Sequence, residues 1–298
     1  MRRFIIGTDW WTDCDDAVAL RLLARSAAAG EIEILGIILN GCMPYSVASL
    51  DAIIAAEGVN VPIGLDREAN DFGRNPPYQK NLAAYAVNHH SNDEAEDGVA
   101  LYRRLLAQAE PGVEIIEIGY PQVLRGLLES SADEYSVLSG VELVREKVSK
   151  LWMMAGKWDV EEGRENNFAR NERSRRGGEA VCRLWPGPVV FLGYEIGDTV
   201  ITGGGLAEDD MLRGALRDHG SENGRCSWDP MLALLAVTGD AEKAGYALTY
   251  GKASVDAETG LCRFERDDSG LHAYVTKTRD DSWYAQEINR RVVSKAIG

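Results

Sequence analysis

The chain has 298 residues, of which 45% are hydrophobic and 27% are charged, a composition that suits a globular protein with a large core. Its 47 Asp and Glu residues outnumber 32 Lys and Arg residues, which gives a formal net charge of −15. A protein without a basic surplus is poorly suited to bind nucleic acid or anionic lipid. We therefore expect neither a nucleic-acid nor a membrane partner.

The cysteines and the N-terminal residues indicate a cytoplasmic protein. Five scattered cysteines form no Cys-x-x-Cys pair, which favours free thiols in a reducing compartment over disulfides or a zinc site. The first apolar run is too short for a signal peptide, and no apolar stretch has membrane-spanning length. We therefore expect a cytoplasmic location.

Strand and helix patterns alternate along most of the chain. Short apolar runs predict buried strands at residues 4–7, 33–39, 61–64, 113–118, 151–154 and 189–192. Helical patterns lie between many of these runs, which is typical of a parallel sheet. The sequence predicts an α/β fold: one large domain over residues 1–298, with a mostly parallel, Rossmann-like central sheet flanked by helices. Near the C-terminus, residues 261–275 predict a hairpin and residues 282–297 a closing helix.

Residues 66–97 interrupt this alternation. The segment contains loop-forming Asn, Gly and Pro residues and a polar stretch around His89 and His90. A break of this length within a compact domain is usually functional or mobile. We predict a mobile active-site loop here.

Four carboxylates lie between the first strand and the first helix: Asp9, Asp13, Asp15 and Asp16. In open α/β sheets, ligands bind at this end of the strands. Helix capping would explain two of them, with Asp13 as N-cap and Asp16 in the first turn. It does not explain four, because like charges so close together repel and raise one another's pKa. A hard divalent cation, calcium or magnesium, relieves that repulsion, so the cluster predicts a metal site.

Further polar residues follow later elements. Asn40 and Gln122 each follow a predicted strand, and Glu165 and Asn167 lie in the loop after the 151–154 strand. Asp229 precedes Pro230 at a predicted helix start, where N-capping alone is an ordinary explanation. If the strands are parallel, all these side chains face one edge of the sheet.

The sequence resembles the inosine-uridine preferring nucleoside hydrolase family. Residues 9–17, DWWTDCDDA, resemble the longer form of that family's N-terminal aspartate motif, although Gly7 replaces its usual first aspartate. The Glu-x-Asn element resembles residues 165–167, and the late Asp-Pro resembles residues 229–230. The calcium-binding Gly-Pro-Leu-Thr segment would fall on residues 119–122.

The resemblance implies calcium-dependent hydrolysis of the N-glycosidic bond of ribonucleosides, giving ribose and free base. Asp9 would be a calcium ligand and the general base for the attacking water. Asp16, Asp229 and the main-chain carbonyl of Gln122 would complete the calcium ligands. The residues that would bind the ribose hydroxyls are Asp15, Asn40, Glu165 and Asn167. Asp13 belongs to the longer motif but has no assigned role.

Position 228 departs from the commoner family pattern. Many members carry a histidine there to protonate the leaving base, whereas this chain has Trp228. A purine-preferring branch stacks the base between tryptophans, so Trp228 would stack on the base, with core packing as the alternative. The family also implies a homodimer or homotetramer and a role in purine or pyrimidine salvage.

Two other functions compete with this hypothesis. A phosphatase of the haloacid dehalogenase type needs Asp-x-Asp at the end of the first strand. Here Asp9 is followed by Trp10 and Trp11, so the second aspartate of that motif is absent. The other hypothesis is a relative that retains the metal site and binds a nucleoside or sugar, either without turnover or with an unusual substrate. This hypothesis stays open because the histidine acid is missing.

Overall fold

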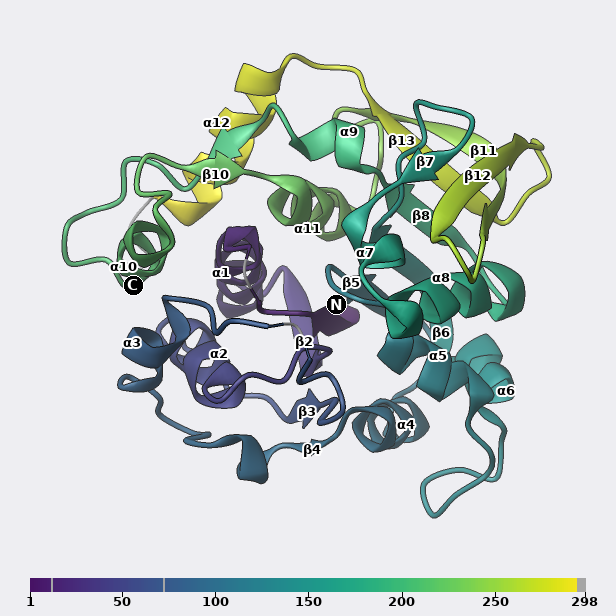
Figure 1. The fold of residues 1–298 in the computed structure, drawn as a ribbon, viewed down its shortest axis with the longest axis horizontal. Helices are drawn as coiled ribbons and strands as arrows, with labels where there is room; N and C mark the ends of the chain where they lie inside the picture. The colour runs from purple at the N-terminus through teal and green to yellow at the C-terminus, as the bar shows by residue number, and fades with distance from the viewer. Residues whose placement is uncertain (12, 72, 294–298) are drawn as a thin grey trace.

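A central sheet determines the architecture of the protein (Figure 1). The structure is a computed structural model and describes residues 1–11, 13–71 and 73–293. Within this part of the chain, eleven strands form one sheet in the order β4-β3-β2-β1-β5-β6-β8-β13-β11-β12-β7. The strands are β1 (Arg2–Thr8), β2 (Ile32–Leu39), β3 (Ile63–Leu65), β4 (Glu96–Asp97), β5 (Val113–Glu117), β6 (Val148–Met154), β7 (Gly163–Arg164), β8 (Val189–Leu192), β11 (Tyr246–Val255), β12 (Leu261–Arg266) and β13 (His272–Lys277). A separate pair joins β9 (Ile201–Thr202) to β10 (Arg225–Cys226).

The sheet is parallel from β4 to β13, and β11, β12 and β7 extend it with antiparallel pairings. Strands covered on both faces read as continuous apolar runs, which is why the central strands are recognisable in the sequence. The predicted α/β fold with a mostly parallel sheet is confirmed.

Helices cover both faces of this sheet (Figure 1). A separate apolar core lies between the sheet and the helices on each face. The first face carries α1 (Asp15–Ala28), α2 (Ser46–Ala55), α11 (Trp228–Thr238) and α12 (Asp281–Val292). The second face carries α4 (Gly98–Gln108), α5 (Gln122–Glu129), α6 (Gly140–Lys147) and α8 (Glu172–Leu184). Shorter helices are α3 (Gln79–Ala83), η1 (Asn92–Glu94), α7 (Asn166–Ala169), α9 (Tyr194–Gly197) and α10 (Met211–His219). No helix in the described ranges is long and apolar enough to span a membrane.

The hairpin predicted for residues 261–275 is wrong. β12 and β13 do not pair with each other, because β11 lies between them and pairs with both. β11 is not predicted from the sequence, because buried and exposed residues are mixed along it and it lacks the apolar run of the central strands. The closing helix is present as α12, and the part predicted for residues 294–297 lies outside the described residues.

Residues 66–97 are not one irregular loop, since they contain α3, η1 and β4. Two buried side chains attach the segment to the loop that follows β1. The Tyr78 hydroxyl donates a hydrogen bond to the main-chain oxygen of Trp11, and the Gln79 amide donates one to that of Trp10. Mobility and a role as an active-site loop stay predictions, and position 72 lies outside the described residues.

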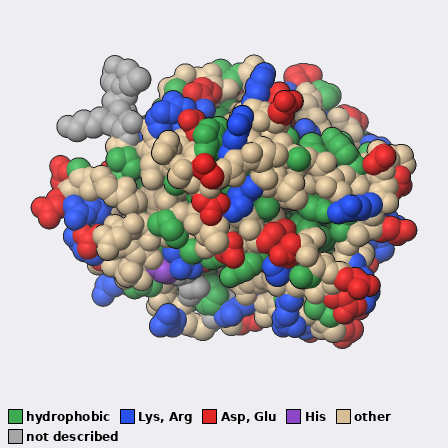
Figure 2. Space-filling model, turned by 90° about the horizontal axis from the view of Figure 1, so that it is seen from above, with side chains coloured by type: hydrophobic (Ala, Val, Ile, Leu, Met, Phe, Trp, Pro, Cys, Tyr) green, Lys and Arg blue, Asp and Glu red, His purple; other side chains and the backbone are tan. Residues whose placement is uncertain are grey.

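The surface carries charges of both signs. On the face shown in Figure 2, acidic and basic side chains are interspersed with each other and with uncharged groups. Within helices, some charged side chains pair across one turn, and examples are Arg125 with Glu129 and Arg183 with Glu179. Exposed pairs of this kind contribute little to stability.

Candidate active site

The loop from Asp9 to Cys14 lies between β1 and α1. The Asp9 carboxylate accepts a hydrogen bond from the main-chain N–H of Trp11 (3.0 Å), and Asp16 accepts one from the Thr8 hydroxyl. The residue at the N-cap of α1 is Cys14, with no side-chain capping bond. Helix capping by Asp13 therefore does not account for the aspartate cluster.

Trp10 gives this loop an unusual backbone conformation. Its φ of 48° lies in the left-handed region, which costs a non-glycine residue on the order of 1 kcal/mol. The fully buried indole holds the conformation by donating to the Ser49 hydroxyl (2.7 Å) and packing edge-on against Tyr78. Strain maintained by surrounding contacts is typical of functional loops.

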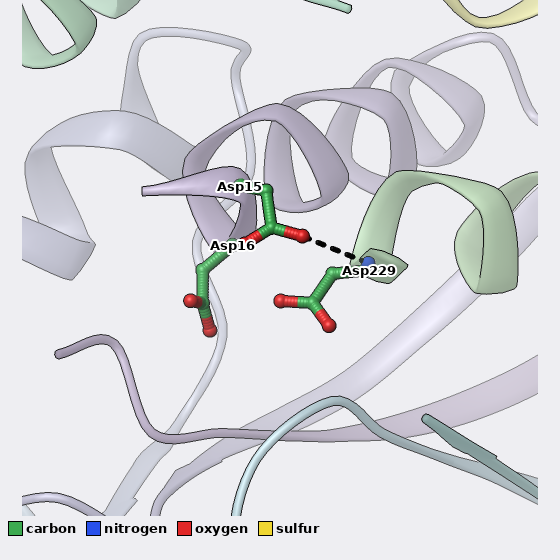
Figure 3. Close-up of side chains that lie close together, drawn as sticks. All are labelled: Asp15, Asp16 and Asp229. Atoms are coloured by element: carbon green, nitrogen blue, oxygen red, sulfur yellow. Dashed lines mark hydrogen bonds between the residues drawn. The ribbon is translucent and has the colours of Figure 1, made fainter. Parts of the chain in front are cut away.

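Three buried carboxylates converge at the start of α1 and α11 (Figure 3). Asp15, Asp16 and Asp229 each offer an oxygen atom, and these atoms lie within 4.8 Å of one another. The main-chain N–H of Asp229 also donates to the Asp15 carboxylate (3.0 Å), which links the two helix starts. All-oxygen donors this close together suit a hard divalent cation, so this trio could hold a metal ion.

Asp229 does not act as the N-cap of α11. The helix begins at Trp228, and Ser227 occupies the N-cap position. The N-capping explanation for Asp229 is therefore wrong, and its carboxylate points toward Asp15 and Asp16 instead (Figure 3).

Burial strongly disfavours the charged forms of these groups. It raises the pKa of Asp9 to about 8, with Asp13 and Asp15 adding repulsion. Burial likewise raises the pKa values of Asp15, Asp16 and Asp229 well above the ordinary value, and their neighbouring carboxylates raise them further. Mutual repulsion among buried carboxylates is what a bound cation would remove, so the donor set fits a divalent metal.

Glu165 and Asn167 form another wall of the same pocket. Glu165 is the N-cap of α7, and its carboxylate accepts hydrogen bonds from the N–H groups of Asn167 (2.7 Å) and Gly156 (3.0 Å). Burial nevertheless raises its pKa to about 7. Asn167 donates from its side chain to the Met154 carbonyl at the end of β6, which fixes its orientation (2.8 Å).

Aromatic rings line the remaining side of the pocket. Trp228 stacks against Tyr194 with ring centroids 5.4 Å apart and an angle of 28° between the planes. The indole N–H donates to the Tyr194 carbonyl (2.8 Å). Arg225 lies 5.5 Å from the Trp228 ring and forms a two-pronged ion pair with Asp13 (2.7 and 2.9 Å). Asp13 therefore has a local partner, which its motif alone did not reveal.

The structure brings most of the predicted site residues together. The pocket is lined by Asp9, Asp13, Asp15, Asp16, Ile118, Met154, Glu165, Asn166, Asn167, Tyr194, Trp228 and Asp229. Asp15, which we predicted to bind ribose, belongs to the compact trio. Asp9, which we predicted to bind the metal, lines the pocket outside that trio. The individual roles stay predictions.

Asn40 and Gln122 lie behind the pocket and are absent from its lining. Asn40 is fully buried, donates to Glu117 (2.8 Å) and accepts from the N–H of Tyr120 (2.9 Å). The Gln122 side chain donates to the Asn40 carbonyl (2.7 Å), which joins the ends of β2 and β5. Contact of Asn40 with ribose and of the Gln122 carbonyl with calcium stays a prediction.

Three residues of the site and its surroundings are not predicted from the sequence: Glu117, Tyr194 and Arg225. Glu117 was detectable as an acidic residue inside the apolar run at 113–118, an arrangement that needs a specific partner when buried. Tyr194 and Arg225 had no comparable signal, because only the folded chain places them beside Trp228 and Asp13.

Comparison with known proteins identifies the fold. No protein family model and no curated protein sequence matches the chain. Among solved structures, an inosine-uridine preferring nucleoside hydrolase from Bacillus anthracis matches with a TM-score of 0.68 at 15% identity, over 98% of this chain and 100% of that one. A purine-preferring ribonucleoside hydrolase from Gardnerella vaginalis matches with a TM-score of 0.70 at 16% identity, over 98% of each chain.

A third similar structure is the type III effector protein XopQ complexed with adenosine diphosphate ribose. Its TM-score is 0.67 at 14% identity, over 99% of this chain and 94% of that one. Sequence identities this low establish a shared fold only. The chain therefore has the fold of the nucleoside hydrolases.

Proposed function

We propose that the protein is a calcium-dependent nucleoside hydrolase that cleaves ribonucleosides into ribose and free base. The observation that carries this proposal is the convergence of Asp15, Asp16 and Asp229 beside Glu165 and Asn167, in a fold shared with nucleoside hydrolases. Carboxylates and an amide around one pocket offer both cation ligands and hydrogen-bond partners for sugar hydroxyls.

In this proposal, Asp15, Asp16 and Asp229 hold the calcium ion, with Asp9 and the Gln122 carbonyl as the further ligands that the resemblance implies. The ion would supply a positive charge that orients the ribose diol and a water molecule. Glu165 and Asn167 would bind ribose hydroxyls, since both lie in the pocket with orientations fixed by hydrogen bonds.

Asp9 would take a proton from the attacking water. Its carboxylate lines the pocket beside the trio and is held by the N–H of Trp11, so it is placed to accept that proton. The water oxygen forms a bond to C1′ as the bond from C1′ to the base nitrogen breaks. The electrons of that bond pass to the base, which would gain a proton from solvent. Trp228 would stack on the leaving base and favour purines.

The test is reducing-sugar release from a panel of purine and pyrimidine ribonucleosides, with calcium and with a chelator. We expect ribose release that the chelator abolishes and that is faster for purines. In Asp9→Ala, turnover should fall by about 10²- to 10⁴-fold, the usual contribution of a general base, while the fold is kept. Wild-type turnover in Asp9→Ala would contradict the assignment of Asp9.

A second candidate is a protein that binds a phosphorylated ribosyl compound through the same metal site. A second hollow, lined by Arg164, Glu165, Asn166, Ala169 and Arg170, adjoins the first through the two residues they share. Arginine suits phosphate, and the XopQ structure holds adenosine diphosphate ribose. Calorimetric binding of that compound, without ribose release from any nucleoside, would favour this candidate.

Other expectations stay predictions. The resemblance implies assembly as a homodimer or homotetramer and a role in purine or pyrimidine salvage. The cysteines and the N-terminal residues indicate a cytoplasmic location.

A further inference from the structure

Glu117 is a fully buried carboxylate behind the aspartate loop. It lies at the end of β5, directly beside Gly7 of β1 in the parallel register. Its Oε1 accepts hydrogen bonds from the Asn40 side chain (2.8 Å) and from the N–H of Gly119 (3.0 Å). Its Oε2 is buried and has no hydrogen-bond partner among the described residues. A buried carboxylate is costly, so its presence calls for a specific role.

Gly7 and Glu117 occupy complementary space. A Cβ atom added at Gly7 would lie 2.1 Å from Oε2 of Glu117, far inside the contact distance of non-bonded atoms. A side chain at position 7 would therefore require the Glu117 carboxylate to move from its present place and from its hydrogen bonds to Asn40 and Gly119. Position 7 is also where the resembling family usually has the first aspartate of its motif. In this chain, the carboxylate beside the loop comes from the neighbouring strand.

The hydrogen bonds of Glu117 connect the end of β2 with the turn after β5, and that turn packs against the aspartate loop. Asn40, which Glu117 holds, accepts from the N–H of Tyr120 through its own side-chain oxygen (2.9 Å). Gly119, which also donates to Glu117, packs so closely on the loop that an added Cβ would lie 2.3 Å from the Asp9 nitrogen. Glu117 thus fixes the turn after β5 and the end of β2 against the backbone of Asp9.

We propose that Glu117 is a positioning residue that replaces the missing carboxylate of position 7 and holds the Asp9 loop in its metal-binding shape. The inference rests on the proposed function for the nature of the site. It does not require Glu117 to touch metal or substrate. The inference predicts that a carboxylate at position 7 of β1 can substitute for the one at position 117 of β5, and that the metal site is then kept.

The experiment compares Glu117→Ala with the double variant Gly7→Asp/Glu117→Ala, using the full-length chain. Calcium affinity is measured by calorimetry, and kcat/KM is measured with inosine. Glu117→Ala should lose about 10- to 100-fold in calcium affinity, as is usual when a residue supporting metal ligands is removed. The double variant should recover most of that loss. Gly7→Asp alone should lower Tm, because two side chains then compete for one space.

Two further variants keep the test decisive. Glu117→Gln retains the shape and the Oε1 acceptor, so its calcium affinity should stay closer to wild type than that of Glu117→Ala, even if the alanine variant folds poorly. Glu114→Gln is the matched control, a buried glutamate of the same strand held by Arg2 and Trp152. It should lower Tm and leave calcium affinity unchanged.

Three outcomes would overturn the inference: unchanged calcium affinity in Glu117→Ala, a double variant that regains Tm but not calcium affinity, or a wild-type chain that binds no calcium. A wild-type chain that binds calcium but hydrolyses no nucleoside would refute the proposed hydrolase. The calcium measurements would still decide the role of Glu117.

Discussion

At the scale of single residues, the site combines groups that would be unstable in isolation. Trp10 adopts a left-handed backbone conformation, and four buried aspartates have raised pKa values. The hydrogen bond from Trp10 to Ser49 holds the strained backbone in place. The hydrogen bond from the N–H of Asp229 to Asp15 lowers the pKa of Asp15 and so offsets part of the cost of burying its charge. The chain therefore sacrifices local stability where it concentrates negative charge, which is typical of functional sites.

Trp228 provides the sharpest test of substrate recognition by one residue. If it stacks on the base, Trp228→Ala should raise KM for purine nucleosides, because stacking on an aromatic ring contributes about 1–3 kcal/mol per base. Trp228→Phe should keep most of this effect. Steady-state kinetics with inosine and uridine checks the expectation, and Trp283→Ala, a tryptophan of α12, is the control. An unchanged KM in Trp228→Ala would favour core packing.

At the scale of elements, the site depends on contacts between segments far apart in sequence. The part of residues 66–97 around α3 packs on the aspartate loop through Tyr78 and Gln79, which bond to the main-chain oxygens of Trp11 and Trp10. The loop is thereby supported from the segment that we predict to border the active site.

The Tyr78 hydroxyl offers a test of this support. Tyr78→Phe leaves the ring in place but removes a buried hydrogen bond to the loop, which typically costs about 1–3 kcal/mol. We expect a lower Tm and weaker calcium binding, measured by calorimetry. Tyr85→Phe, an exposed tyrosine of the same segment, should change neither. Equal calcium affinities in the two variants would contradict a supporting role for the segment.

Local sequence patterns revealed those parts of the fold and site that depend on neighbours along the chain. The run of aspartates after the first strand indicated a metal site because four like charges in eight residues need a cation. Glu117 could not be assigned a role in this way, because its partner Gly7 lies 110 positions earlier and becomes a neighbour only through the register of β1 and β5. The pairing of β11 between β12 and β13 was hidden for the same reason.

At the scale of the whole molecule, the buried carboxyl groups couple stability to pH. Burial raises the pKa values of Asp9 and Glu117 to about 8 and that of Glu165 to about 7, from ordinary values of 3.8 for Asp and 4.5 for Glu. Because the folded state then binds protons more tightly than the unfolded state, the free energy of unfolding falls as pH rises between the ordinary and the raised values. A bound cation would take the place of those protons.

We therefore expect that, in a chelator, Tm is higher near pH 5 than near pH 8, and that calcium raises Tm more near pH 8 than near pH 5. Scanning calorimetry across this range with and without calcium checks both parts. Asp133→Asn is the control, because Arg103 lowers the pKa of Asp133 to about 2. The contribution of Asp133 to the free energy of unfolding is therefore lost only at a pH more acidic than this range. This variant should keep the slope of Tm against pH that the wild type has in chelator. In Asp16→Asn, calcium should stabilise the protein much less, because one buried carboxylate of the trio is gone. A Tm that is independent of pH in chelator would mean that these carboxyl groups are solvated or already compensated in the folded protein.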